Sequence, residues 1–187
     1  MIEYIFPVPL FSEKLNLNVK DMTKYCLDFK KKASSVSVSN IGGWQSPSLE
    51  GEHKPLNDLF KSILDASEKY CEIIQYKHPL KIGALWVNIN RYKDYNTDHI
   101  HPHSVASGVF YVKAKSGDLI FKHPLSKVME YDWPLSTLES YNRSNCPNWE
   151  IPPVNNQLLI FPGWLTHLVR PNLNKEDRIS ISFNLIR

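Results

Sequence analysis

The 187-residue sequence predicts a mainly β domain, a β-sandwich or jelly roll with two helices packed on one outer face. Helical periodicity occurs twice before residue 77, and from residue 82 onward apolar residues recur with a period of two. The strands that this period predicts do not alternate with helices, so antiparallel sheets are expected rather than βαβ units. We therefore expect one domain, in which residues 1–80 supply a strand and the helices and residues 81–187 form the jelly-roll core.

The first 40 residues predict a strand, a helix and a second short strand. Residues 1–10 are apolar and β-prone, which indicates a strand. Asn18 can cap a helix that ends near Lys32, because apolar residues recur at helical spacing between them. Lysines also gather near the end of this helix, where the helix dipole favours positive charge. Residues 34–39 alternate serine with valine, so they indicate a short strand.

A loop and a second helix complete the N-terminal part. Residues 40–54 are rich in glycine and proline and predict a loop. Pro55 suits the first turn of a helix, and an apolar stripe continues from there to about Tyr76. Two amphipathic helices need a flat apolar surface to cover, and the strands that follow are expected to provide it.

The C-terminal part predicts short strands and one long loop. The strands are expected at residues 82–90, 107–113, 118–122, 157–161, 164–169 and 178–186. Ser116-Gly117 predicts a tight turn that joins two of these strands as a hairpin. Residues 124–153 show little periodicity, which predicts a loop. Two interpretations of this aromatic loop are open: it covers a bound substrate, or it packs on the edge of the sandwich.

Composition limits the partners and the location of the protein. The net charge of +3 is too small to favour binding to nucleic acid. Three cysteines without CxxC spacing indicate reduced thiols, as in cytoplasmic proteins. The N-terminus lacks the pattern of a signal peptide, and no apolar run approaches the roughly 18 residues of a membrane span. We expect a cytoplasmic protein that does not act on membranes.

A cluster of histidines is the first candidate functional feature. In an extended strand His99 and His101 point to the same face, and His103 joins them unless Pro102 bends the chain. Histidine is the commonest metal ligand among side chains. His167 lies on a distant predicted strand, and two ligands close in sequence with a third from elsewhere are usual in a metal site inside a barrel. The alternative is that these histidines bind no metal.

The last predicted strand carries the second candidate feature. Arg178, Ser180, Ser182 and Asn184 share one face of this strand, while its other face is apolar. Burying the arginine is costly without a partner, and a carboxylate ligand would supply one through two parallel hydrogen bonds. We expect Arg178 and His167 on adjacent antiparallel strands. The alternative is a surface strand whose arginine pairs with a nearby acid.

Taken together, these motifs resemble the Fe(II)/2-oxoglutarate-dependent dioxygenases, whose double-stranded β-helix carries HxD/E, a distant histidine and then Arg-x-Ser. The similarity is greatest to a small bacterial and phage subgroup and extends over almost the whole chain. The shared segments are Phe6-Pro7, Gly43-Trp44-Gln45-Ser46, Trp86-Val87-Asn88, His99-Ile100-His101-Pro102, Ser107-Gly108-Val109-Phe110-Tyr111, Phe161-Pro162 with His167, and Arg178-Ile179-Ser180 with Phe183-Asn184.

The resemblance implies a set of roles for the motif residues. Fe(II) is held by His99, His101 and His167, and the far carboxylate of 2-oxoglutarate meets Arg178 and Ser180. Asn88 and Tyr111 are candidates for orienting this cosubstrate. The implied reaction hydroxylates an unidentified substrate, a small molecule or a protein side chain, with release of succinate and CO2.

The sequence departs from the general superfamily at the second metal ligand, which is His101 where a carboxylate is usual. Asp98 is adjacent to His99 but should point away from it, and His103 could replace one ligand. An all-histidine site leaves the metal more positive, which favours binding of an anion. Two alternatives remain: a three-histidine cupin-type metalloenzyme that does not use 2-oxoglutarate, and a non-catalytic metal-binding jelly roll.

Overall fold

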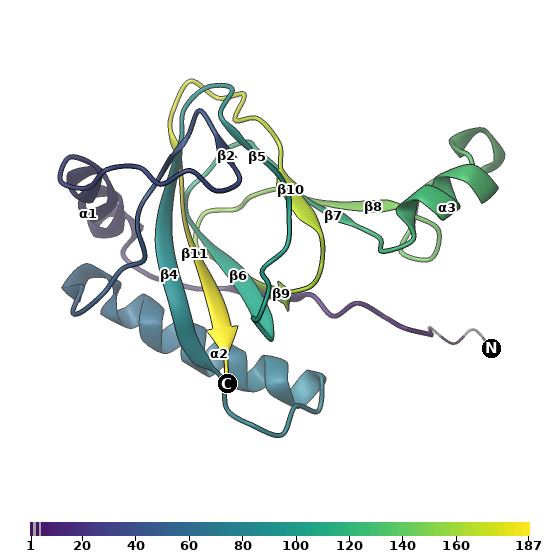
Figure 1. The fold of residues 1–187 in the computed structure, drawn as a ribbon, viewed down its shortest axis with the longest axis horizontal. Helices are drawn as coiled ribbons and strands as arrows, with labels where there is room; N and C mark the ends of the chain where they lie inside the picture. The colour runs from purple at the N-terminus through teal and green to yellow at the C-terminus, as the bar shows by residue number, and fades with distance from the viewer. Residues whose placement is uncertain (2, 4) are drawn as a thin grey trace.

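Two antiparallel sheets face each other in the computed structural model, which describes residues 1, 3 and 5–187 (Figure 1). The large sheet has the order β1 (Phe11–Lys14), β9 (Gln157–Pro162), β6 (Ala106–Lys113), β11 (Arg178–Ile186), β4 (Lys81–Asn90) and β3 (Trp44–Gln45). The small sheet has the order β2 (Asn40–Ile41), β5 (Tyr95–His99), β10 (His167–Val169), β7 (Leu119–Lys122) and β8 (Asn148–Ile151). This architecture confirms the predicted mainly β jelly roll.

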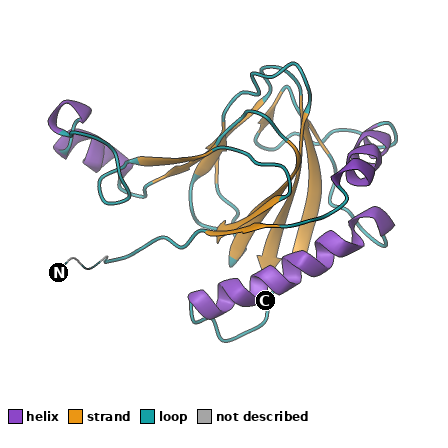
Figure 2. Cartoon of the chain, turned by 180° about the vertical axis from the view of Figure 1, so that it is seen from behind, coloured by secondary structure: helices purple, strands orange, loops and turns teal. Residues whose placement is uncertain are grey.

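Both predicted N-terminal helices pack on the large sheet (Figure 2). In α1 (Val19–Lys30) the side chain of Asn18 caps the first turn by accepting a backbone N–H at 3.2 Å. A short 3-10 turn, η1 (Lys54–Leu56), contains the predicted helix-starting proline and leads into α2 (Asn57–Ile73). The helices therefore form as the apolar periodicity predicts, and each ends a few residues earlier than expected.

Strand alternation decides which side chains meet the helices and which face the space between the sheets. The apolar positions of β4 and β11 join the helix residues in one buried cluster, and these are Leu85, Val87, Ile89, Ile179, Ile181, Phe183 and Leu185. Several alternate positions of the same strands are polar and line a cavity between the sheets, among them Asn88, Ser180 and Ser182. The helices thus cover one face of the large sheet and leave its polar face for the site.

The strand expected at residues 1–10 is wrong, because the first strand, β1, begins at Phe11. Phe6 has a left-handed backbone with φ 62°, and Pro7 and Pro9 have no N–H to donate to a sheet. Residues 2 and 4 lie outside the described residues. The apolar character of this segment therefore does not reflect a place in the sheet.

The strand expected at residues 34–39 is also wrong, and β2 and β3 form instead within residues 40–54, where a loop is expected. The Asn40 side chain donates to the carbonyls of Val36 and Gly43, at 3.1 and 2.9 Å, and holds the two segments together. These hydrogen bonds depend on the Asn40 side chain and not on a local period. The alternation of residues 34–39 therefore misplaces the strands.

The predicted hairpin at Ser116-Gly117 is wrong as well. β7 pairs with β10 and β8 in the small sheet, whereas β6, which precedes the turn, belongs to the large sheet. The Ser116 hydroxyl accepts the backbone N–H groups of Leu173 and Asn174 at 3.0 and 3.1 Å. These contacts, distant in sequence, make the turn a crossing between sheets.

β10 and β11 likewise lie in different sheets, so the expectation that His167 and Arg178 occupy adjacent strands is wrong. β10 begins only at His167, and residues 163–166 form the turn that leads into it. Both side chains nevertheless line the same cavity between the sheets. The sandwich therefore brings together residues that do not share a strand pair.

Residues 123–147, which we call the arm, extend from the end of β7 away from the sandwich and return in β8 (Figure 1). The arm contains α3 (Ser126–Asp132) and a 3-10 turn, η2 (Leu135–Thr137). The expectation of an unstructured loop over residues 124–153 is therefore wrong for these elements and for β8. Among the residues described, no helix is both long and apolar enough to cross a membrane.

Candidate metal centre

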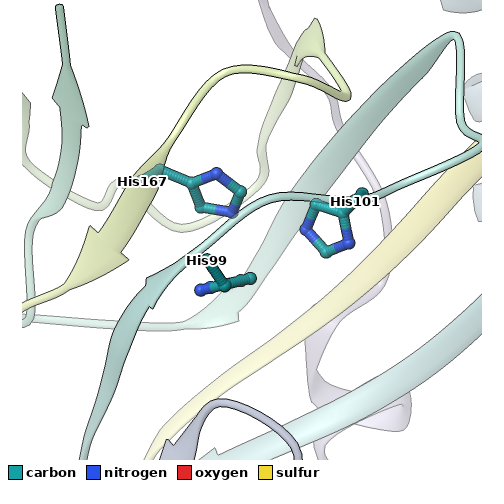
Figure 3. A group of neighbouring side chains, drawn as sticks. All are labelled: His99, His101 and His167. Atoms are coloured by element: carbon teal, nitrogen blue, oxygen red, sulfur yellow. The ribbon is translucent and has the colours of Figure 1, made fainter. Parts of the chain in front are cut away.

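Three histidine side chains converge between the sheets, as Figure 3 shows. His99 ends β5 and His167 begins β10, and the two residues are register partners across these antiparallel strands. His101 follows two residues later in the chain, so it returns to the same face. One ring nitrogen from each histidine lies within 4.8 Å of the others. This spacing suits a single metal ion, because three imidazoles converge on one point from two elements.

Backbone carbonyls orient two of the rings. The Nδ1 of His99 lies 2.7 Å from the carbonyl oxygen of Thr97, and the Nδ1 of His167 lies 2.8 Å from that of Leu165. Because a carbonyl oxygen only accepts, each Nδ1 carries the proton and each Nε2 keeps its lone pair. This pattern of a second hydrogen bond is usual for histidines that bind metal through the other nitrogen.

Burial keeps the three imidazoles neutral. Burial, together with the smaller effect of the neighbouring His99, lowers the pKa of His167 to about 3 and that of His101 to about 4. Burial also lowers the pKa of His99, although its bond to the Thr97 carbonyl offsets part of this change. Neutral imidazole is the form that binds metal, so the cluster is ready for a cation near pH 7.

The loops that carry His101 and His167 are held against each other at Gly163. The backbone N–H of His101 donates to the Gly163 carbonyl at 2.8 Å. A Cβ at position 163 would lie 2.4 Å from the Ser104 carbonyl oxygen and 3.1 Å from that of His101. A side chain at this position would therefore separate the two loops. The sequence around Gly163 carries no signal of this close approach.

Two other candidate ligands lie outside the histidine cluster. Asp98 forms an ion pair with Lys122 of β7 and is not one of the converging groups. His103 is exposed, has a left-handed backbone with φ 64°, and is likewise not part of the cluster. Among the described residues, the groups that converge are therefore His99, His101 and His167.

Arg178 lies in the same cavity as the histidines and is 3% exposed. Its Nη1 donates to the Asn90 side chain at 3.2 Å, and its guanidinium lies 5.5 Å from the centre of the Tyr111 ring. Its Nε and the Tyr111 hydroxyl are buried without a hydrogen-bond partner in the described part of the chain. Burial lowers the Arg178 pKa, and the neighbouring Tyr111 offsets part of this change.

An unpaired buried guanidinium is costly, so the expected alternative of a surface arginine paired with a local acid does not fit. Glu176 pairs instead with Lys113 and Lys115, at 3.2 and 3.0 Å. Among the described residues, no carboxylate lies within ion-pair distance of Arg178, so the arrangement suits an anionic ligand that accepts from Nε.

The cavity that joins the two groups has a volume of about 230 Å³. Among the described residues of its lining, Arg178 is the one cation, and besides the histidines the others are neutral polar or apolar. The predicted candidates Asn88, Tyr111 and Ser180 all line it, and Asn88 donates to the Ser182 hydroxyl at 3.0 Å. The polar side chain of Asn88 therefore faces the cavity.

Two further residues of β4 contribute to the site. Trp86 lies 5.8 Å from the His101 ring, and Asn90 accepts a hydrogen bond from Arg178. Both lie on the same face of β4 as Asn88, so the strand alternation in the sequence already indicates that the three side chains point the same way.

A jelly roll that places a histidine cluster beside a buried arginine without an acidic partner among the described residues is typical of metal-dependent enzymes of the double-stranded β-helix type. A family model described as "Putative 2OG-Fe(II) oxygenase" matches residues 84–184, more than half of the chain, and the chain belongs to this family. The protein is thus a 2-oxoglutarate- and Fe(II)-dependent oxygenase. No curated protein sequence matches it significantly.

Solved structures with the same fold include a hydroxylase and an epimerase. A prolyl-4-hydroxylase from Pseudomonas putida has a TM-score of 0.68 and 11% identity, covering 96% of this chain and 94% of that chain. The 2-oxoglutarate-dependent epimerase SnoN from nogalamycin biosynthesis has a TM-score of 0.70 and 13% identity, covering 96% and 78%. HygX from Streptomyces hygroscopicus, solved with nickel and 2-oxoglutarate, has a TM-score of 0.63 and 10% identity, covering 95% and 82%. At these identities the likeness supports the fold.

Proposed function

We propose that His99, His101 and His167 hold Fe(II), and that Arg178 and Ser180 hold the distal carboxylate of 2-oxoglutarate. The observation that carries the proposal is that the buried Arg178 Nε has no hydrogen-bond partner among the described residues. Arg178 lines the cavity that also contains the histidine cluster. An anion with one end on the metal and the other at Arg178 would satisfy both groups. Neutral histidines leave the metal's full positive charge, which strengthens its attraction for such an anion.

Fe(II) and 2-oxoglutarate, when bound, supply the oxidation of a C–H bond by dioxygen with release of succinate and CO2. The chain's own residues prepare this site. The Thr97 and Leu165 carbonyls fix the ring orientations of His99 and His167. The Tyr111 hydroxyl, buried without a partner, can donate to the carboxylate at Arg178. Asn88 binds Ser182 through its amide nitrogen, so its Oδ1 can accept from a ligand.

The substrate is proposed to be a small molecule or a protein side chain. Both classes occur among structures with this fold. SnoN was solved with Fe3+, α-ketoglutarate and nogalamycin RO, and a prolyl hydroxylase from Trichoplax adhaerens was solved with a peptide fragment. The apolar Val109, Leu119 and Phe161 in the cavity wall limit water beside the reacting groups.

We also propose that the chain functions as one domain in the cytoplasm. A single buried cluster joins helix residues such as Leu59 to strand residues such as Phe183, which supports one folding unit. Cys26, Cys71 and Cys146 are free thiols, as expected in a reducing compartment.

Anaerobic titration tests the metal assignment. Fe(II) with 2-oxoglutarate is expected to give a weak visible charge-transfer band, and replacing His99, His101 or His167 singly with Ala should remove it. His78→Ala, an exposed histidine outside the cluster, is the matched control and should leave the band unchanged. Failure of the wild-type protein to bind 2-oxoglutarate in the presence of either Fe(II) or Mn(II) would contradict the proposal.

A further inference from the structure

The arm carries apolar side chains that no part of the described chain covers. α3 buries none of its residues. The exposed fractions along the arm are 59% for Leu125, 53% for Val128, 85% for Tyr131, 48% for Trp133, 62% for Leu135 and 48% for Tyr141. Soluble monomers rarely expose apolar side chains so densely, and such a surface usually marks an interface. The catalytic site does not account for it, since none of these residues lines the cavity between the sheets.

A groove in this surface has a volume of about 600 Å³, larger than the cavity that contains the histidines. Its walls include Trp133, Tyr141 and Trp149, with Pro134 and Pro147 beside them. Aromatic grooves of this kind bind extended chain segments that contain proline, because such segments lose little conformational entropy on binding.

The carboxylates at the rim of the groove already have partners. Glu130 pairs with Lys127 at 3.1 Å, and Glu150 pairs with Arg170. The groove therefore offers no unpaired charge at these positions, and its expected occupant is an apolar segment rather than a basic one.

The chain itself contains a segment of this kind. Ile5 and Phe6 are 75% and 92% exposed, and Pro7 follows them. Further along the chain, Val8 and Leu10 pack against a buried cluster that includes residues of β7, the strand that leads into the arm. The segment and the arm thus leave the body from one apolar cluster and extend to the same side of the molecule (Figures 1 and 2).

We propose that the groove of the arm is filled by Ile5-Phe6-Pro7 of a second copy of this chain, with the same contact made in return. A two-fold dimer requires an inserting element and a receiving groove on the same side of each copy, and this chain has both. Within one chain the exposure of Ile5 and Phe6 shows that the segment does not occupy its own groove. The exchange would bury the exposed side chains of Ile5 and Phe6 against the apolar side chains of the groove.

Sedimentation velocity of the full chain over a range of concentrations tests the dimer. The wild-type protein is expected to associate, and Phe6→Ser and Trp133→Ser should each raise the dissociation constant at least tenfold. Tyr131→Ser should weaken association in the same direction. Tyr92→Ser, which removes an aromatic ring of 53% exposure outside the arm, is the matched control and should leave the constant unchanged. Phe6 and Tyr131 are so exposed that their replacement should not unfold the protein.

A synthetic peptide of residues 1–10 tests the contact itself. It is expected to change the tryptophan fluorescence of the Phe6→Ser protein, whereas the same peptide carrying Phe6→Ser should not. A wild-type protein that stays monomeric at every concentration would overturn the proposal. The proposal would also be overturned if Phe6→Ser and Trp133→Ser left the dissociation constant of the dimer as unchanged as Tyr92→Ser does. In either case the arm would be left for another occupant, such as a polypeptide substrate.

Discussion

Replacing Arg178 with methionine separates a ligand-binding arginine from a structural one. Arg178 lines the cavity, and among the described residues its buried Nε has no hydrogen-bond partner and its guanidinium has no carboxylate partner. A carboxylate bound there would accept two charge-assisted hydrogen bonds, each contributing about 1.5–3 kcal/mol. Losing both costs about 3–6 kcal/mol, which is a rise of about 10²- to 10⁴-fold in the dissociation constant for 2-oxoglutarate.

The same substitution should hardly affect folding. Within the described part of the chain, the Arg178 side chain donates a hydrogen bond to Asn90 at 3.2 Å, and losing it costs about 1 kcal/mol. Methionine of similar length also removes the cost of burying an unpaired charge, which offsets this loss. By contrast, removing one partner of a buried ion pair would cost about 3–5 kcal/mol.

Two assays measure these effects. Anaerobic calorimetry with Mn(II) gives the affinity for 2-oxoglutarate, and urea denaturation without ligand gives the free energy of unfolding. Arg170→Met, which removes an exposed arginine outside the cavity lining, is the control and should leave 2-oxoglutarate affinity unchanged. The reasoning is refuted if Arg178→Met binds 2-oxoglutarate as tightly as the wild type, or if it loses several kcal/mol of stability without ligand.

Three further predictions concern the metal centre. Asp98→Asn should leave the Mn(II) affinity within about twofold of the wild-type value, because Asp98 pairs with Lys122 and does not bind the metal. A tenfold loss of Mn(II) affinity, about 1.4 kcal/mol, would instead show that Asp98 is a ligand. Gly163→Ala should weaken Mn(II) binding at least about tenfold in calorimetry, since the added Cβ would displace the loop of His101, while the circular dichroism spectrum stays unchanged. A variant that binds Mn(II) as tightly as the wild type would contradict the close approach at Gly163. In the metal-free protein, the pKa values of His101 (about 4) and His167 (about 3) lie below the usual value of about 6.5. The unfolded chain therefore binds protons first, and the free energy of unfolding should fall as pH drops from about 6.5 through 4 towards 3; denaturation curves that do not change over this range would show that the imidazoles are not buried as described.

The sequence predicts the helices and the long strands well because each carries its own periodicity. The apolar stripe of α2 and the alternation along β4 and β11 place these elements nearly at their observed bounds. The short elements do not have this property. β2 and β3 have two residues each and form through pairing with strands distant in the chain, so no local period reveals them.

Most of the candidate site also follows from the sequence. The spacing of His99 and His101 places both rings on one face, and the polar face of β11 identifies Arg178 as a residue that needs a partner. By itself, the sequence determined which residue types lie on which face of each element, because side-chain direction follows from strand and helix periods. It could not determine which sheet each strand joins. Only the tertiary structure placed β10 and β11 in opposite sheets, because strand pairing depends on contacts between residues far apart in the chain. It alone also oriented the histidine rings on backbone carbonyls and left Arg178 without an ion-pair partner among the described residues.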